Sequence, residues 1–184
     1  MGEIASQSQI RMALLRRALV TVPGVVLLGF ASAQFSGSGT NSYWFQQLAL
    51  PAFMPPDWLF PVAWTILYAL IGVALAVVLN ARGAAGRGLA IALFVVQLAL
   101  NLAWSPLFFR LHQVGAAFWL IVALLAAAIA TGAQFSRVRA LAGWLFLPYV
   151  AWLAFAAALN FSIDRMNPGA GELVEPAAST NIRV

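Results

Sequence analysis

Residues 58–79 read WLFPVAWTILYALIGVALAVVL and contain no charged side chain. About 20 apolar residues in a helix cross about 30 Å of hydrocarbon, and this stretch has 22 residues. Apolar side chains would surround such a helix on every side, whereas a surface helix of a soluble protein keeps one polar face. The stretch therefore predicts a transmembrane helix.

Four further apolar runs occur along the chain, at residues 18–35, 89–111, 114–135 and 141–163. None alternates over about 10 residues as a strand of a membrane barrel does. The 184 residues are 63% hydrophobic and 8% charged, against about 45–50% apolar and about 25% charged in soluble domains. We predict an all-α integral membrane bundle of five transmembrane helices over residues 18–163.

The segments outside these helices differ in composition. Residues 1–17 form a basic N-terminal segment, residues 36–57 a long loop with Gly, Ser and Pro, and residues 164–184 a polar tail that we expect to be disordered. One alternative concerns the first helix, because Ala31-Ser32-Ala33 follows basic residues and a short apolar run. That pattern is typical of a signal peptide, here cleaved after Ala33.

All ten basic residues are arginines, and their distribution predicts the orientation in the membrane. Positive residues are enriched in cytoplasmic loops. This bias predicts that the N-terminus lies inside and that the C-terminus and residues 36–57 lie outside. The inner end carries Arg11, Arg16, Arg17, Arg82, Arg87, Arg137 and Arg139, and the outer end carries Arg110, Arg165 and Arg183.

Three predicted helices each place tryptophan together with tyrosine or an amide on one face. The residues that helical spacing brings together are Gln97, Asn101 and Trp104 in the third helix, Trp64 and Tyr68 in the second, and Tyr149, Trp152 and Ala156 in the fifth. Such faces favour an uncharged cavity in which a flat apolar ligand stacks on rings. The alternative is that the amides only bond neighbouring helices. Trp44, Trp58 and Trp144 also fit an interfacial belt, and Trp119 is interpreted as packing.

The charged and reactive residues exclude several functions. No Asp, Glu, Lys or Arg lies well inside a predicted span, which disfavours transport coupled to an intramembrane carboxylate. Without cysteine and with one histidine, we expect neither a metal site nor a hydrolase nucleophile–base pair. The arginines form no patch for nucleic acid. The expected partners are the lipid bilayer and a second copy of the chain, through the small-residue pair Ala99 and Ala103.

Four ordered motifs resemble the TspO family, the tryptophan-rich sensory proteins and translocator proteins, the latter also called peripheral benzodiazepine receptors. The resemblance covers about residues 20–160. The motifs are Trp44-Phe45-x-x-Leu48, Pro55-Pro56-x-Trp58-x-Phe60-Pro61-x-x-Trp64-Thr65-x-x-Tyr68, Gln97-x-x-x-Asn101-x-x-Trp104-Ser105-x-x-Phe108-Phe109, and Pro148-Tyr149-x-x-Trp152 followed by Leu159-Asn160.

The resemblance implies a bacterial multi-pass homodimer in which residues 36–57 form a lid over a ligand cavity. It implies a receptor or sensor that binds porphyrins such as protoporphyrin IX, has no obligatory cofactor, and regulates tetrapyrrole handling or a stress response. Two alternatives stay open, namely light-dependent porphyrin degradation through Trp64 and Trp152, and transport of porphyrin or sterol. The implied ligand-binding residues are Trp44, Phe45, Trp64, Tyr68, Gln97, Asn101, Trp104, Tyr149, Trp152 and Ala156.

The lid departs from the family pattern at two places. Residues 50–53, Leu-Pro-Ala-Phe, stand where Lys-Pro-x-Trp is usual, and Phe45 stands where tyrosine is common. A contact between a lid lysine and a porphyrin carboxylate is therefore not expected. A sterol-binding pattern needs a Lys or Arg shortly after its tyrosine, and the first cation after Tyr149 is the distant Arg165.

Overall fold

The structure is a computed structural model that describes residues 7–39 and 42–173. Its described elements are all helical, and five of the helices are long and apolar enough to cross a membrane. The predicted five-helix membrane bundle is confirmed. The long helices are α1 (Gln7–Phe35), α3 (Leu59–Asn80), α4 (Arg87–Ser105), α5 (Val114–Val138) and α6 (Ala140–Met166), and the short ones are α2 (Tyr43–Gln46), the π-helical turn η1 (Pro106–Arg110) and the 3₁₀ turn η2 (Ala170–Glu172).

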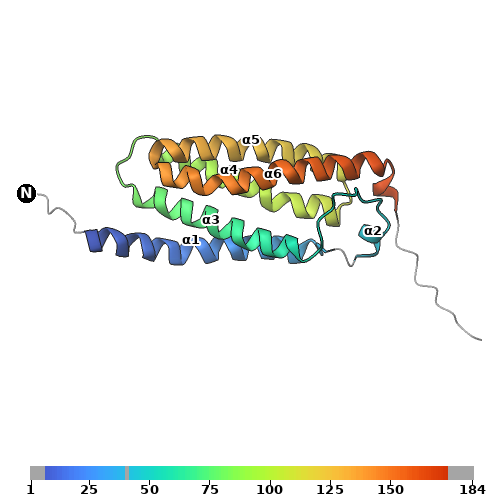
Figure 1. The fold of residues 1–184 in the computed structure, drawn as a ribbon, viewed down its shortest axis with the longest axis horizontal. Helices are drawn as coiled ribbons and strands as arrows, with labels where there is room; N and C mark the ends of the chain where they lie inside the picture. The colour runs from blue at the N-terminus through green and yellow to red at the C-terminus, as the bar shows by residue number, and fades with distance from the viewer. Residues whose placement is uncertain (1–6, 40–41, 174–184) are drawn as a thin grey trace, which may run out of the picture.

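The long helices form a closed ring, and helices that follow one another along the chain run in opposite directions (Figure 1). α1 packs on α3, α3 on α6, α6 on α5 and α5 on α4, and α4 closes the ring against α1. The loop after α1, with α2, lies at the end of the bundle opposite the chain's beginning. The last turn of α6 and η2 lie at that same end, beside the loop.

Two predicted boundaries differ clearly from those in the structure. α1 begins at Gln7 rather than at residue 18, so much of the predicted basic segment is helical. α6 continues to Met166, and η2 follows it, so residues 164–173 are structured where we expected disorder. Residues 1–6 of the basic segment and residues 174–184 of the tail lie outside the described residues.

Glycine lets α1 and α3 approach closely. A Cβ atom built on Gly72 would lie 2.8 Å from the Cα atom of Val22 in α1, and one on Gly29 would lie 2.1 Å from the ring of Tyr68. At the same contact the hydroxyl of Thr21 donates a hydrogen bond of 2.8 Å to the carbonyl of Gly72. Small residues at a helix crossing allow this backbone approach in a membrane protein.

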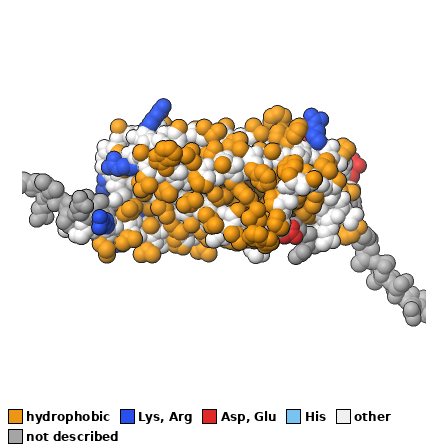
Figure 2. Space-filling model, viewed as in Figure 1, with side chains coloured by type: hydrophobic (Ala, Val, Ile, Leu, Met, Phe, Trp, Pro, Cys, Tyr) orange, Lys and Arg blue, Asp and Glu red, His pale blue; other side chains and the backbone are white. Residues whose placement is uncertain are grey.

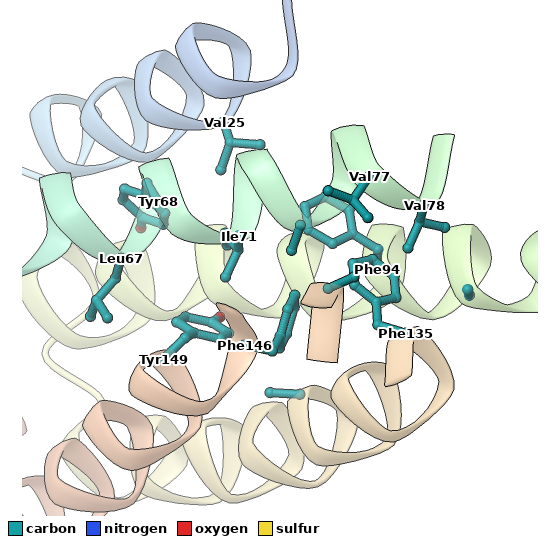
Figure 3. Packing of buried hydrophobic residues seen from close by; sticks show 14 of the residues in the cluster. Val25, Leu67, Tyr68, Ile71, Val77, Val78, Phe94, Phe135, Phe146 and Tyr149 are labelled. Atoms are coloured by element: carbon teal, nitrogen blue, oxygen red, sulfur yellow. The ribbon is translucent and has the colours of Figure 1, made fainter. Parts of the chain in front are cut away.

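The centre of the bundle is filled by aromatic and branched side chains (Figure 3). The rings of Phe94 and Phe135 stack at 5.9 Å, and the ring of Phe146 packs edge-on against both at 6.3 and 5.2 Å. Figure 2 shows a hydrophobic band across the visible face, with arginines toward both ends and acidic groups at the end away from the chain's beginning. This distribution suits a bundle whose long axis crosses the membrane, with the charged ends in water.

Pro106 ends the regular hydrogen bonding of α4. Because proline has no N–H to donate, the chain continues as the π-helical turn η1, in which the N–H of Leu111 reaches the carbonyl of Pro106 at 3.0 Å. η1 carries Phe108 and Phe109, and both rings line the cavity described next. The proline thus shapes one wall of the candidate site.

Candidate functional site

A cavity of about 420 Å³ lies between the five long helices and the lid loop. This volume is within the range of about 300–1,000 Å³ that is typical of small-molecule sites. Among the described residues that line it, Asp57 is the only charged one. The aromatic residues in its wall are Phe30, Phe45, Phe60, Trp64, Tyr68, Trp104, Phe108, Phe109 and Trp152.

The structure places the ten predicted ligand-binding residues in two groups. Trp44, Gln97 and Tyr149 do not line the cavity. Gln97 and Tyr149 are fully buried behind the cavity wall, and Trp44 is a buried residue of the lid itself. Seven of the ten predicted residues line the cavity, and these are Phe45, Trp64, Tyr68, Asn101, Trp104, Trp152 and Ala156.

A chain of four polar side chains crosses the bundle behind the cavity. The hydroxyl of Tyr68 donates to Oδ1 of Asn101 at 2.7 Å, and Nδ2 of Asn101 donates to the hydroxyl of Tyr149 at 3.1 Å. The Tyr149 hydroxyl in turn donates to Oε1 of Gln97 at 2.8 Å. These bonds join α3, α4 and α6. Gln97 therefore bonds a neighbouring helix, which was the alternative to lining the cavity. Asn101 does both, because it bonds Tyr68 and Tyr149 and also lines the cavity.

Trp64 and Trp152 form an aromatic corner in the cavity wall. Their ring centroids are 6.4 Å apart and their planes meet at 83°. Tyr68 stacks on Trp64 at 5.2 Å, and Phe60 packs edge-on against Trp152 at 6.1 Å. Such contacts hold both indoles in fixed orientations. Nε1 of Trp152 is buried, and no described residue accepts a hydrogen bond from it.

Asn160 is a polar cavity residue that the predicted site omits. Its Oδ1 accepts a hydrogen bond of 3.1 Å from Nε1 of Trp104, and its Nδ2 donates to the carbonyl of Val114 at 3.0 Å. The signal was present, because Asn160 continues the stripe of Trp152 and Ala156 at helical spacing. The wall from α1, which includes Phe30 and Ala33, gave no comparable signal, since these residues differ little from others in an apolar helix.

Trp44 and Phe45 have different places in the lid. Nε1 of Trp44 donates to the carbonyl of Ala170 at 2.7 Å, and its ring stacks on His112 at 4.3 Å with 13° between the planes. Phe45 instead reaches the cavity and packs against Phe109 at 5.8 Å. Ser42 begins α2, because its side chain accepts a hydrogen bond from the Phe45 N–H. Trp44 therefore anchors the lid, and Phe45 closes the cavity.

Three tryptophans with exposed rings lie outside the cavity, and Trp58, just before α3, is one of them, as expected of an interfacial residue. Trp144 is largely exposed near the start of α6, as expected of an interfacial residue. Trp119 was expected to pack inside the bundle, but 70% of its surface is exposed. It lies in the first two turns of α5, where its ring faces outward beside Phe118. All three are natural controls for the cavity tryptophans.

The chemistry of the cavity favours binding through stacking and hydrogen bonds. Its wall offers large rings, the hydroxyl of Tyr68 and the amides of Asn101 and Asn160. Within residues 7–39 and 42–173, no three His, Cys, Asp or Glu side chains lie close enough together to hold a metal ion. A flat molecule with few charges fits these groups.

Comparison with known proteins gives a consistent result. Protein CrtK of Rhodobacter capsulatus is 42% identical over 130 residues, covering 68% of this chain and 79% of its own. The tryptophan-rich protein TspO of Chlorobaculum tepidum is 39% identical over 142 residues, covering 77% and 89%. The human translocator protein is 36% identical over 160 residues, covering 80% and 93%. Residues 20–166 match the TspO/MBR family. The chain belongs to the TspO/MBR family of tryptophan-rich sensory and translocator proteins.

Proposed function

We propose that this membrane protein binds porphyrins such as protoporphyrin IX, and related flat apolar molecules, and acts as a receptor in tetrapyrrole sensing or handling. The observation that carries the proposal is the corner of Trp64 and Trp152, which offers two aromatic faces at 83° inside one cavity. Aromatic ligands stack on such faces, and the amides of Asn101 and Asn160 supply polar groups in the same wall.

The charges of the cavity indicate how a porphyrin would be oriented. The described wall contains no cation, and the exposed Asp57 lies at the lid end, just before α3. A porphyrin carboxylate would be costly to bury without a partner. The macrocycle would therefore lie against Trp64 and Trp152, with its acidic edge at the mouth in water. Binding in the micromolar range corresponds to about 8 kcal/mol.

Quenching of tryptophan fluorescence by protoporphyrin IX tests the proposal. We expect saturable quenching of the parent protein, and affinity at least about tenfold weaker in the double variant Trp64→Phe/Trp152→Phe, because two stacking surfaces shrink. Trp119→Phe is the matched control, since it removes an exposed indole outside the cavity. Equal affinity of the double variant and the control would contradict the proposed stacking site.

A second candidate function is light-dependent porphyrin degradation. The contact between Trp64 and Trp152 favours it, because two touching indoles beside a bound porphyrin are suited to donate electrons to it. Illumination of the complex followed by product analysis separates this function from binding alone. An unchanged porphyrin spectrum after illumination would count against degradation. Transport is the remaining alternative, and it predicts flux of a fluorescent porphyrin into vesicles that contain the protein.

We further propose that the N-terminus faces the cytoplasm of a bacterial cell. Arg17 and Arg87 both bond the last turn of α3 at the end where the chain begins, Arg17 through Asn80 and Arg87 through the carbonyls of Val78 and Leu79. The chain has no cysteine. A single cysteine introduced at one end of the bundle therefore reports which side of the membrane that end faces.

Those cysteines go into loops at opposite ends of the bundle. A membrane-impermeant maleimide applied to spheroplasts should label Gln113→Cys in the loop before α5 and leave Ala85→Cys, in the loop before α4, unlabelled until lysis. Both parent residues are exposed. The reverse pattern would contradict the orientation.

A further inference from the structure

We propose that residues 167–172, directly after α6, form a latch that holds the lid closed and sets how fast a ligand enters and leaves the cavity. For its effect on ligand exchange, the proposal rests on the ligand-binding function proposed above. The latch itself is carried by contacts between the lid and this segment, which lie more than a hundred residues apart in sequence.

Asn167 clamps the lid backbone from both sides. Its Oδ1 accepts a hydrogen bond of 2.8 Å from the N–H of Ala49, and its Nδ2 donates to the carbonyl of Ala49 at 2.9 Å. The same Nδ2 also donates to the carbonyl of Ile163 at 2.8 Å, in the last turn of α6. The Ile163 carbonyl also accepts the backbone N–H of Asn167 at 3.1 Å, so the Asn167 amide adds a second bond at this helix end and fastens a lid residue to α6.

Trp44, within α2, supplies the second fastening. Its indole N–H donates to the carbonyl of Ala170, and only 2% of its surface is exposed. Its ring lies between His112, on which it stacks, and Phe108, which packs edge-on at 5.5 Å. A buried tryptophan with its N–H paired is a strong anchor, because opening the lid would expose the ring and break the bond.

The two fastenings bracket the lid residue that closes the cavity. Phe45 lines the cavity and lies between Trp44 and Ala49 in sequence. The lid therefore cannot lift away from the cavity while both contacts to residues 167–172 persist. α6 itself carries Trp152 and Ala156 in the cavity wall, so the helix that contacts the ligand also holds the lid.

This arrangement also couples the cavity to residues 167–172, which follow α6. Because coupling between two sites is reciprocal, a ligand that favours the closed lid also favours the latched form of residues 167–172. A change that releases residues 167–172 must likewise make the closed lid less stable. For a sensory protein, the latch thus gives a physical route by which a ligand in the cavity changes how often residues 167–172 are bonded to the lid.

Hydrogen exchange of the ligand-free protein tests the latch without any ligand. In Asn167→Ala we expect the amides of residues 44–49 to exchange about tenfold faster than in the parent, equivalent to about 1.4 kcal/mol, while the centre of α6 is unchanged. Trp44→Phe, which keeps an aromatic ring but removes the N–H, should act in the same direction. The matched control is Ser162→Ala, which removes only a hydrogen bond within α6, from the Ser162 hydroxyl to the carbonyl of Ala158. Lid exchange at the parent rate in both latch variants would overturn the proposal.

Stopped-flow quenching with protoporphyrin IX tests the consequence for exchange. Asn167→Ala should raise the association and dissociation rates together by about three- to tenfold, with Kd changed less than either rate, since Asn167 does not line the cavity. Unchanged rates, or a faster dissociation matched by an equal loss of affinity, would overturn gating. Failure of the parent to bind porphyrin would instead refute the proposed ligand, and hydrogen exchange would still decide the latch.

Discussion

Three tryptophans use their indole N–H groups in three different ways. That of Trp44 bonds the backbone of Ala170, that of Trp104 bonds the side chain of Asn160, and that of Trp152 has no partner among the described residues. A buried donor without a partner costs about 1–3 kcal/mol. The buried Trp152 N–H therefore carries a cost, whereas the N–H groups of Trp44 and Trp104 hold the lid and the cavity wall.

The hydroxyl of Tyr149 is predicted to stabilise the bundle. Tyr149→Phe would leave Oε1 of Gln97 and one N–H of Asn101 buried without their present partners. We expect a loss of about 1–3 kcal/mol in the free energy of unfolding, measured as a lower Tm in detergent. Because Asn101 also lines the cavity, porphyrin affinity should fall as its amide loses one of its two anchors.

Tyr43→Phe is the control for that experiment. Tyr43 carries the same hydroxyl but lies exposed at the start of α2. Surface substitutions of this kind change stability by about 0.5 kcal/mol or less. A Tm for Tyr149→Phe equal to that of Tyr43→Phe would mean that the buried chain of four side chains contributes nothing to stability.

At the scale of the helix, α1 is part of the cavity wall. It supplies Gly29, Phe30, Ala33 and Gln34 to the cavity wall and packs along the length of α3. Cleavage after Ala33 would remove most of that wall. We therefore expect the purified protein to retain α1, so that its intact mass is that of the uncleaved chain, about 19.7 kDa. A mass lower by the first 33 residues would contradict this and leave a cavity open to lipid.

The contact of α1 with α3 should be sensitive to a single methyl group. In Gly72→Ala the new Cβ would meet the Val22 backbone at 2.8 Å, which no side-chain rotation relieves. We expect a loss of about 1–3 kcal/mol from overpacking, measured as a lower Tm. The control is Gly24→Ala in α1, whose Cβ meets nothing within 4 Å. Destabilisation by both variants alike would indicate that the close approach is not the cause.

Element by element, the sequence predicted helix centres better than helix ends. The last four apolar runs match helical segments to within three residues at each end when η1 is counted as the continuation of α4, because hydrophobicity alone defines the part that lies in lipid. α1 begins earlier than predicted, since a helix can continue into water with arginines on it. The structured residues 167–172 were missed because the Asn167 and Ala170 contacts depend on a distant loop.

For the whole molecule, composition was enough to predict the membrane bundle, but not which stripe residues face the cavity. Tyr149 and Trp152 lie three residues apart in α6, yet Tyr149 is buried in the core and Trp152 lines the cavity. Their helical spacing places them on one face, whereas the rotation of α6 against α3 and α4 decides which of them reaches the cavity. That rotation follows from packing among several helices, which spacing in one helix does not contain.

The outer surface of α4 leads to the prediction of a dimer. Ala99 and Ala103 are both exposed there, together with the neighbouring Val95 and Val96. In lipid such a surface gains little from hydrophobicity, so helices associate through close packing of small residues. We expect the protein to be a homodimer in nanodiscs, and Ala103→Trp to make it monomeric because the indole prevents close approach.

Mass photometry of the nanodisc samples measures this change directly. Ala126→Trp, on the exposed side of α5, is the matched control and should leave the dimer intact, since it adds the same ring to another lipid-facing helix. Ala103→Trp should keep the parent's affinity for protoporphyrin IX, because the cavity is enclosed by one copy of the chain and Ala103 does not line it. A dimer that persists in Ala103→Trp would show that α4 is not the interface, and its loss in Ala126→Trp would move the interface to α5.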